Sequence, residues 1–156
     1  MKAVVYIESS VISYLTARPS RDVVTAARQA ITSEWWDNHR QRYELYISAL
    51  VEEEITSGDA TAAQRRIEAV VDIPSLGITP EAQELAQVLL DGKGVPANSV
   101  EDALHIGIAA TQGAEFLLTW NFKHINNAET KALIEKLVED QGYLCPILCS
   151  PEELGG

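Results

Sequence analysis

The stretch that decides the fold is VYIESS at residues 5–10, an apolar run that stops at an acid and two serines. A buried parallel strand has this pattern where it emerges at its carboxyl end, because both of its faces are covered. A second run of this kind, LLTWNF, lies at residues 117–122. In open α/β sheets ligands bind outside such strand ends, so the polar residues that end both runs mark an expected site.

The chain between and around these runs alternates between strand and helix patterns. Thr79-Pro80-Glu81 is a strong helix start, with a capping residue, a proline at the first helical position and an acid in the first turn. Alternating strands and helices predict an α/β fold with a parallel sheet covered on both faces. The predicted strands are 4–7, 45–49, 73–78 (a short edge strand or loop), 116–119 and 143–149, and the predicted helices are 20–39, a short one ending at 54, 59–71, 79–90, 99–110 and 128–141.

Length and composition bound the class of protein. The chain has 156 residues, enough for one domain with a real core, which we place at residues 1–154. The tail 150–156 is expected to be peripheral. In a chain with two cysteines and no signal-peptide pattern, Cys145 and Cys149 are expected to be reduced core residues.

The net charge of −11 argues against a protein that coats nucleic acid electrostatically. It leaves room for a nuclease whose acidic site holds Mg²⁺. No apolar run is long enough to span a bilayer, and the first residues read as a strand rather than a signal peptide. We therefore expect a cytoplasmic protein with no membrane partner.

Two acids are candidate site residues in the first half of the chain. Glu8 follows the first apolar run; its ordinary role would be a solvated strand end or a helix cap. Helical spacing places Glu54 on the same face as Leu50, which is unusual for a solvent-facing acid. The neighbouring Glu52 and Glu53 are expected to be solvated.

The second half supplies an acid, a histidine and two polar strand-end residues. Asp102 lies in the first turn of an apolar helix, where its ordinary role would be a favourable interaction with the helix dipole. It shares an inward face of that helix with His105. A histidine there is more often a hydrogen-bonded core residue than a metal ligand. Thr119 and Asn121 end the last apolar run, and Asn121 would either accept a water, hold a neighbour in place or form a turn.

Carboxylates gathered at one sheet edge repel one another unless they are protonated or hold a cation. A hard divalent ion with oxygen ligands is the simplest resolution, so we expect Mg²⁺ or Mn²⁺. The sequence contains no P-loop, GxGxxG, GxSxG, HExxH or EF-hand pattern.

Four segments in order resemble the four motifs of PIN-domain proteins, and the most similar kind is the VapC-like toxins of bacterial toxin–antitoxin pairs. The segments are IESSVIS at 7–13, SALVEEEI at 48–55, DALHI at 102–106 and LTWNF at 118–122. The resemblance covers residues 4 to about 154. It implies a three-layer α/β/α sandwich with a central parallel sheet, an Mg²⁺- or Mn²⁺-dependent ribonuclease, a homodimer and a cognate antitoxin.

The resemblance also implies site residues. The family's three successive carboxylates match Glu8, Glu54 and Asp102, which would be the metal ligands. Its fourth acidic position matches Asn121, and the Ser/Thr before it matches Thr119. Two departures stand out: Glu8 occupies a position that usually carries Asp, and Asn121 removes one negative charge.

The sequence therefore predicts a PIN-type endoribonuclease in which a metal polarises a scissile phosphate of an RNA substrate and activates water. Arg18, Arg21 and Lys123 follow motif segments and are candidates for neutralising flanking phosphates. One alternative is a PIN-like interaction module for protein or nucleic acid, with its site weakened by the two departures. A phosphoacceptor receiver domain is a weaker alternative, because no Asp ends a central strand.

Overall fold

The computed structural model describes residues 1–155 and contains a parallel sheet of five strands in the order β3-β2-β1-β4-β5. The first strand of the chain is therefore central, and its neighbours come from distant parts of the sequence. The strands are β1 (Ala3–Ile7), β2 (Tyr43–Ser48), β3 (Ser75–Leu76), β4 (Phe116–Leu118) and β5 (Ile147–Cys149).

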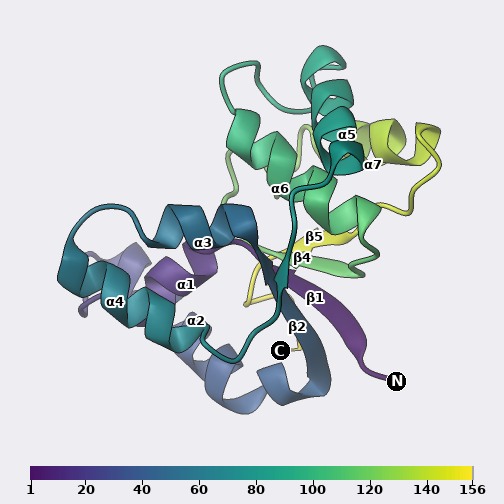
Figure 1. Ribbon diagram of the computed structural model, residues 1–156. Helices are drawn as coiled ribbons and strands as arrows, with labels where there is room; N and C mark the ends of the chain where they lie inside the picture. The colour runs from purple at the N-terminus through teal and green to yellow at the C-terminus, as the bar shows by residue number, and fades with distance from the viewer. Residues whose placement is uncertain (156) are drawn as a thin grey trace.

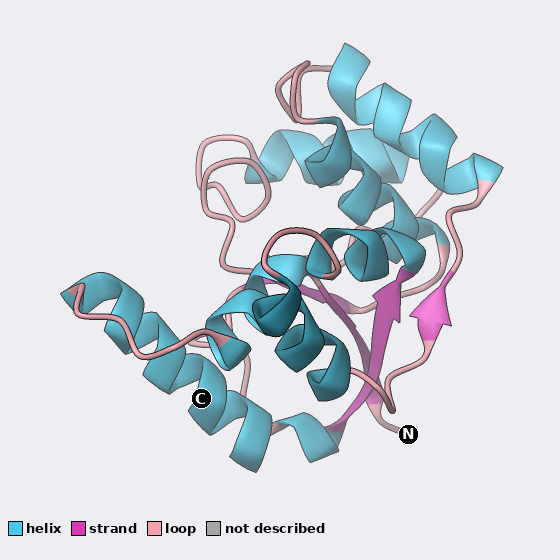
Figure 2. Ribbon diagram, turned by 60° about the vertical axis from the view of Figure 1, so that its left-hand side comes forward, coloured by secondary structure: helices cyan, strands magenta, loops and turns pink. Residues whose placement is uncertain are grey.

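Helices cover the two faces of this sheet. Helices α1 to α4 gather on one side, and α5, α6 and α7 on the other, so the predicted three-layer α/β/α arrangement is confirmed (Figure 1). Figure 2 shows the strands between these helical layers. The helices are α1 (Ser9–Thr16), α2 (Val23–Asn38), the 3₁₀ helix η1 (Arg40–Arg42), α3 (Ala49–Ile55), α4 (Ala60–Ala69), α5 (Pro80–Asp91), α6 (Val100–Thr111) and α7 (Lys131–Asp140).

Helix α1 is an element that the sequence pattern did not predict. Its N-cap is Glu8, whose carboxylate accepts a hydrogen bond from the backbone N–H of Ser10. A helix cap was one of the expected roles of Glu8, but glutamate is not among the residues that usually cap helices, so the helix that follows it was not predicted. At the start of α6, by contrast, the N-cap residue Ser99 makes no side-chain capping hydrogen bond.

The C-terminal tail is not peripheral, and that expectation is wrong. Ser150, Pro151 and Leu154 are buried, and Leu154 belongs to the hydrophobic core. Arg42 also donates a hydrogen bond to the backbone carbonyl of Gly155 at 2.8 Å. The tail therefore packs against the core and reaches the residues that precede β2. Strand β5 itself is shorter than the predicted strand 143–149.

Helix α6 lies unusually close to α5. A methyl group added at Gly107 would come within 2.4 Å of the backbone oxygen of Ala82, well inside contact distance. Residues 105–110 of α6 are all buried, as an apolar helix packed between a sheet and a second helix requires. This packing fixes the start of α6, where Asp102 and His105 lie.

Candidate functional site

The register of β1 and β4 brings the ends of the two apolar runs together. Ile7 pairs with Leu118, and the backbone N–H of Glu8 donates to the carbonyl of Leu118 at 3.0 Å. Glu8 and Thr119 are consequently neighbours at the carboxyl edge of the sheet, as the sequence predicts. This edge is where a parallel α/β sheet presents its ligand site.

The Glu8 carboxylate is buried and held by three donors. Its Oε1 accepts from the hydroxyls of Ser10 at 2.5 Å and Thr119 at 2.6 Å, and its Oε2 accepts from the backbone N–H of Ser10 at 3.0 Å. Only 7% of Glu8 is exposed. The serine after the acid and the threonine at the end of β4 therefore fix one carboxylate in one orientation.

Glu54 reaches the same edge from α3, whose N-cap is Ser48 at the end of β2. Its Oε1 accepts from the hydroxyl of Ser9 at 2.5 Å and from Nε2 of His105 at 2.7 Å. Burial raises the pKa of Glu54, but the contacts with His105 and the Ser9 hydrogen bond outweigh it, so the pKa is lowered overall. Glu54 is therefore a carboxylate at neutral pH. Glu52 and Glu53 are exposed, as expected.

Glu8, Glu54 and His105 form a cluster whose potential ligand atoms all lie within 4.8 Å of one another. The meeting of Glu8 and Glu54 follows the sequence prediction. His105 is fully buried and hydrogen-bonded, as expected for a core histidine, yet it is also part of this cluster. Its position three residues after Asp102, on the inward face of α6, was the signal for it.

A chain of two hydrogen bonds holds the other ring nitrogen of His105. Its Nδ1 lies 2.7 Å from the hydroxyl of Tyr6, which lies 2.7 Å from the hydroxyl of Ser48. Because a carboxylate only accepts, His105 Nε2 donates to Glu54, and every proton finds an acceptor if Tyr6 donates to Nδ1 and Ser48 donates to Tyr6. Burial is the main cause that raises the pKa of Tyr6. The hydrogen bond with Ser48 lowers this pKa, and the charges of Glu8 and Glu54 raise it.

Asp102 points to a different set of partners at the same edge. Its Oδ1 accepts from the side-chain amide of Asn121 at 3.0 Å, and its Oδ2 lies 2.9 Å from Nδ1 of His124. The side-chain carbonyl oxygen of Asn121 accepts from the backbone N–H groups of Lys123 at 3.1 Å and His124 at 2.9 Å. Asn121 thus holds a neighbour and forms a turn, two of the roles expected for it.

His124 is a site residue that the sequence analysis missed. Besides Asp102, its Nδ1 lies 3.2 Å from the hydroxyl of Ser99, so it links the loop after β4 to the start of α6. It follows the fourth motif and has no periodicity of its own, and no sequence signal marks it. Within residues 1–155, both oxygens of Asp102 are thereby engaged.

The three cations proposed for phosphate contacts are exposed. The side chains of Arg18, Arg21 and Lys123 form no ion pair in the described part of the chain. Their role with phosphate stays a prediction.

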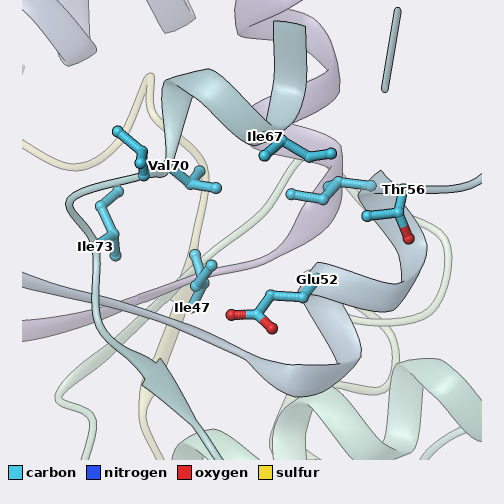
Figure 3. Close-up of a pocket in the computed structure, with 8 residues that line it drawn as sticks. Ile47, Glu52, Thr56, Ile67, Val70 and Ile73 are labelled. Atoms are coloured by element: carbon cyan, nitrogen blue, oxygen red, sulfur yellow. The ribbon is translucent and has the colours of Figure 1, made fainter. Parts of the chain in front are cut away.

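An apolar pocket lies away from these acids. It has a volume of about 250 Å³ and lies between α3, α4 and the edge of the sheet (Figure 3). None of the predicted site residues lines it; its lining is Ile47, Glu52, Ile55, Thr56, Ile67, Val70, Val71 and Ile73.

Within residues 1–155, none of the helices has the length and apolar character that a membrane-spanning segment requires.

The donors of the cluster fit a divalent cation. Carboxylate oxygens are preferred by Mg²⁺ and Mn²⁺, whereas both ring nitrogens of His105 are engaged, by Glu54 and by Tyr6. Glu54 receives both of its hydrogen bonds on Oε1, and within residues 1–155 its Oε2 accepts none. An oxygen of a held carboxylate is therefore available beside a second, buried carboxylate.

Comparisons with known proteins bear on the fold. No family model matches the chain, and no curated protein matches it. A solved structure does: a chain of the crystal structure of VapBC2 from Rickettsia felis bound to a DNA fragment from their promoter, with a TM-score of 0.53 and 14% identity. The match covers 94% of this chain and 98% of that one. At this identity the likeness shows a shared fold over almost the whole length.

Proposed function

We propose that this protein is a metal-dependent endoribonuclease of the PIN type and the toxin component of a toxin–antitoxin pair. The observation that carries the proposal is the meeting of Glu8 and Glu54 within 4.8 Å of each other and of His105, at the carboxyl edge of a parallel sheet. Two carboxylates from segments 46 residues apart, each fixed by hydroxyl donors, are the arrangement that a cation site needs.

The fold and the four ordered motifs support the biological role. The solved structure with a similar fold contains VapBC2, and the four motifs of this chain resemble those of VapC-like toxins. We extend this resemblance to the partners: an RNA substrate, a cognate antitoxin and a second copy of the chain in a homodimer, all in the cytoplasm.

Glu8, Glu54 and Asp102 would hold Mg²⁺ or Mn²⁺. The ion, when bound, polarises a phosphate and lowers the pKa of a water. The protein's own residues prepare that chemistry. Ser10 and Thr119 fix the Glu8 carboxylate, and Ser9 and His105 fix the Glu54 carboxylate.

One observation favours the second candidate, a PIN-like interaction module without turnover. Asp102 is tied to Asn121 and His124 and lies outside the cluster of Glu8, Glu54 and His105. Each oxygen of Asp102 already accepts one hydrogen bond, so an ion would use a remaining lone pair, and the carboxylate would have to approach the cluster. A protein in which Asp102 stays at its present distance would keep the fold and lose the third anionic ligand.

Cleavage of single-stranded RNA separates the two candidates. The protein is incubated with a 5′-labelled RNA in Mn²⁺, in Mg²⁺ and in EDTA, beside Glu54→Gln and Glu52→Gln. Glu52 is an exposed glutamate on the same helix, so its substitution removes the same charge outside the cluster. We expect cleavage by the wild type and Glu52→Gln in either metal, and none by Glu54→Gln or in EDTA. Equal cleavage by all three proteins would point to a contaminant, and no cleavage by the wild type would favour the interaction module.

A further inference from the structure

A half-buried arginine, Arg28 of α2, lies against two aromatic rings beside the candidate site. Its guanidinium carbon is 5.4 Å from the ring centroid of Trp120 and 5.2 Å from that of Phe122. The two rings are 5.9 Å apart and nearly perpendicular. Cation–π contacts of this kind orient a guanidinium while leaving its N–H groups free along its edge.

Those N–H groups have few partners. Across residues 1–155 the guanidinium makes one hydrogen bond, from Nη1 to the hydroxyl of Tyr14 at 3.4 Å, and it forms no ion pair. This is unusual in a chain with 23 acidic residues. Arg66, by comparison, donates to the carbonyls of Ile55 and Ser57. A planar cation held in place with unused donors is suited to a phosphate.

The position of these rings connects them to the acids. The backbone N–H of Trp120 donates to the hydroxyl of Ser10 at 2.9 Å, and that hydroxyl donates to Glu8. Phe122 directly follows Asn121, which contacts Asp102. Trp120 is buried, whereas Phe122 remains 38% exposed. An aromatic ring that contacts an arginine and a tryptophan and stays partly open to solvent is suited to stacking with a nucleobase.

We propose that Arg28 binds a phosphate of a single-stranded RNA chain and that Phe122 stacks on an adjacent base. This inference rests on the proposed function, because it names the residues that receive the strand next to the acids. It assigns the phosphate contact to a positioned arginine, in addition to the exposed Arg18, Arg21 and Lys123.

Binding of a fluorescent single-stranded RNA in EDTA, followed by anisotropy over a range of salt concentrations, tests the assignment without turnover. The variants are Arg28→Ala, Arg28→Lys, Phe122→Leu and Arg40→Ala. Arg40 is a matched control, since its guanidinium carbon lies 4.7 Å from the ring centroid of Trp36. It belongs to η1, which directly precedes β2, so it lies at the amino-terminal ends of the strands and away from the candidate site. Thermal melts of each variant report whether the fold is kept.

We expect Arg28→Ala to weaken binding and to reduce the slope of log K against log salt by about 0.7, the loss of one phosphate contact on a single strand. Arg28→Lys keeps the charge and should keep the slope while binding more weakly. Phe122→Leu should weaken binding about tenfold with an unchanged slope, because it removes a stacking face and no charge. Arg40→Ala should match the wild type.

A duplex of the same sequence buries its base faces, so its binding should not respond to Phe122→Leu. The assignment is overturned if Arg28→Ala and Phe122→Leu bind single-stranded RNA as Arg40→Ala does, or if duplex binding responds equally to Phe122→Leu. If the wild type cleaves RNA but these variants bind normally, only this assignment fails. If the wild type neither binds nor cleaves RNA, the proposed function fails, and this inference fails with it.

Discussion

The side-chain amide of Asn121 donates a hydrogen bond of 3.0 Å to the carboxylate of Asp102. The carbonyl of the same amide accepts from the backbone N–H groups of Lys123 and His124. An aspartate at this position would keep the second function and lose the first, because a carboxylate has no proton to donate. The amide therefore holds Asp102 where an acid would repel it.

Asn121→Asp should consequently destabilise the protein in EDTA and tighten its binding of Mn²⁺. Loss of a hydrogen bond to a charged group and a new repulsion between carboxylates should lower the free energy of unfolding by about 1–3 kcal/mol. A cation relieves the repulsion, so the variant should gain more from Mn²⁺ than the wild type. Urea titrations in EDTA and calorimetric Mn²⁺ titrations measure the two effects.

The control is Asn127→Asp, which makes the same change in the same loop at a residue whose amide donates to the carbonyl of Lys123. It should leave Mn²⁺ affinity unchanged. Equal Mn²⁺ affinities for the wild type and Asn121→Asp would show that residue 121 is remote from any ion.

The identity of the third ligand follows from Mn²⁺ titrations of two further variants. We expect Asp102→Asn to weaken Mn²⁺ binding, because a hard cation prefers a carboxylate. His105→Gln should bind Mn²⁺ nearly as the wild type does, because Nε2 of His105 carries a proton for Glu54 and the glutamine amide supplies the same donor. The opposite order of affinities would transfer the third ligand position to His105.

The contact between His105 and Tyr6 should appear as a coupling energy in a double-mutant cycle. His105→Leu removes the donor to Glu54 and leaves the buried hydroxyl of Tyr6 with one partner, Ser48, at an expected loss of about 2–4 kcal/mol. Tyr6→Phe in the same background removes that hydroxyl, so the double variant should be more stable than the sum of the single losses predicts, by about 1 kcal/mol. Urea unfolding of the four proteins in EDTA gives the result, and strict additivity would contradict the hydrogen bond.

Gly107→Ala should lower the free energy of unfolding by at least about 1 kcal/mol, because the new methyl group meets the backbone of α5 and neither helix can move aside cheaply. The helix propensity of alanine, which alone would favour the variant, is too small to offset this clash. Gly77→Ala is the matched control, since nothing lies within 4 Å of the added carbon. Equal stability of both variants in urea would mean that the two helices are not held this closely.

The two thiols should be protected in the folded protein. Burial first, and then the charges of Glu135 and Glu139, raise the pKa of Cys145 to about 12. Burial and then the charge of Glu153 raise the pKa of Cys149 to about 12, although the charge of Lys131 acts to lower it. At pH 9 a thiol-specific reagent should therefore label the native protein far more slowly than the urea-unfolded chain. Comparable labelling rates would contradict the burial of these residues.

The same raised pKa values give a stability dependence with a definite sign. A thiol whose pKa is higher in the folded state favours folding fully below its ordinary pKa of 9.0, and this contribution is lost as pH rises from 9.0 to about 12. Cys149→Ala removes one of the two groups. Its stability should therefore fall less steeply than that of the wild type over this range.

The sequence predicts the parts of the site that depend on strand ends. Two apolar runs that stop at Glu8 and Thr119 indicate parallel strands, and their carboxyl ends meet at one edge. The spacing within α3 likewise turns Glu54 inward. These features depend on local periodicity, which is readable without knowledge of the partners.

The features that the sequence did not predict depend on contacts between distant segments. Helix α1 was not predicted, because its N-cap is Glu8, a residue that rarely caps helices and is also part of the site. The engagement of Asp102 by Asn121 and His124, and the position of Arg28 against Trp120 and Phe122, follow from side-chain packing across the sheet edge. Periodicity indicates which face a residue occupies, and it gives no information about which side chain lies opposite.

The central place of β1 has a consequence for synthesis of the protein. Strand β1 pairs on one side with β2 and on the other with β4, so Glu8 obtains the Thr119 hydroxyl only after residue 119 has been translated. A ribosome-bound chain that ends before residue 119 carries Glu8, Glu54 and His105 but lacks β4 and the hydroxyl that helps to fix the Glu8 carboxylate. If the proposed activity is correct, the nascent protein is inactive toward the RNA around it until its last strands have emerged and folded.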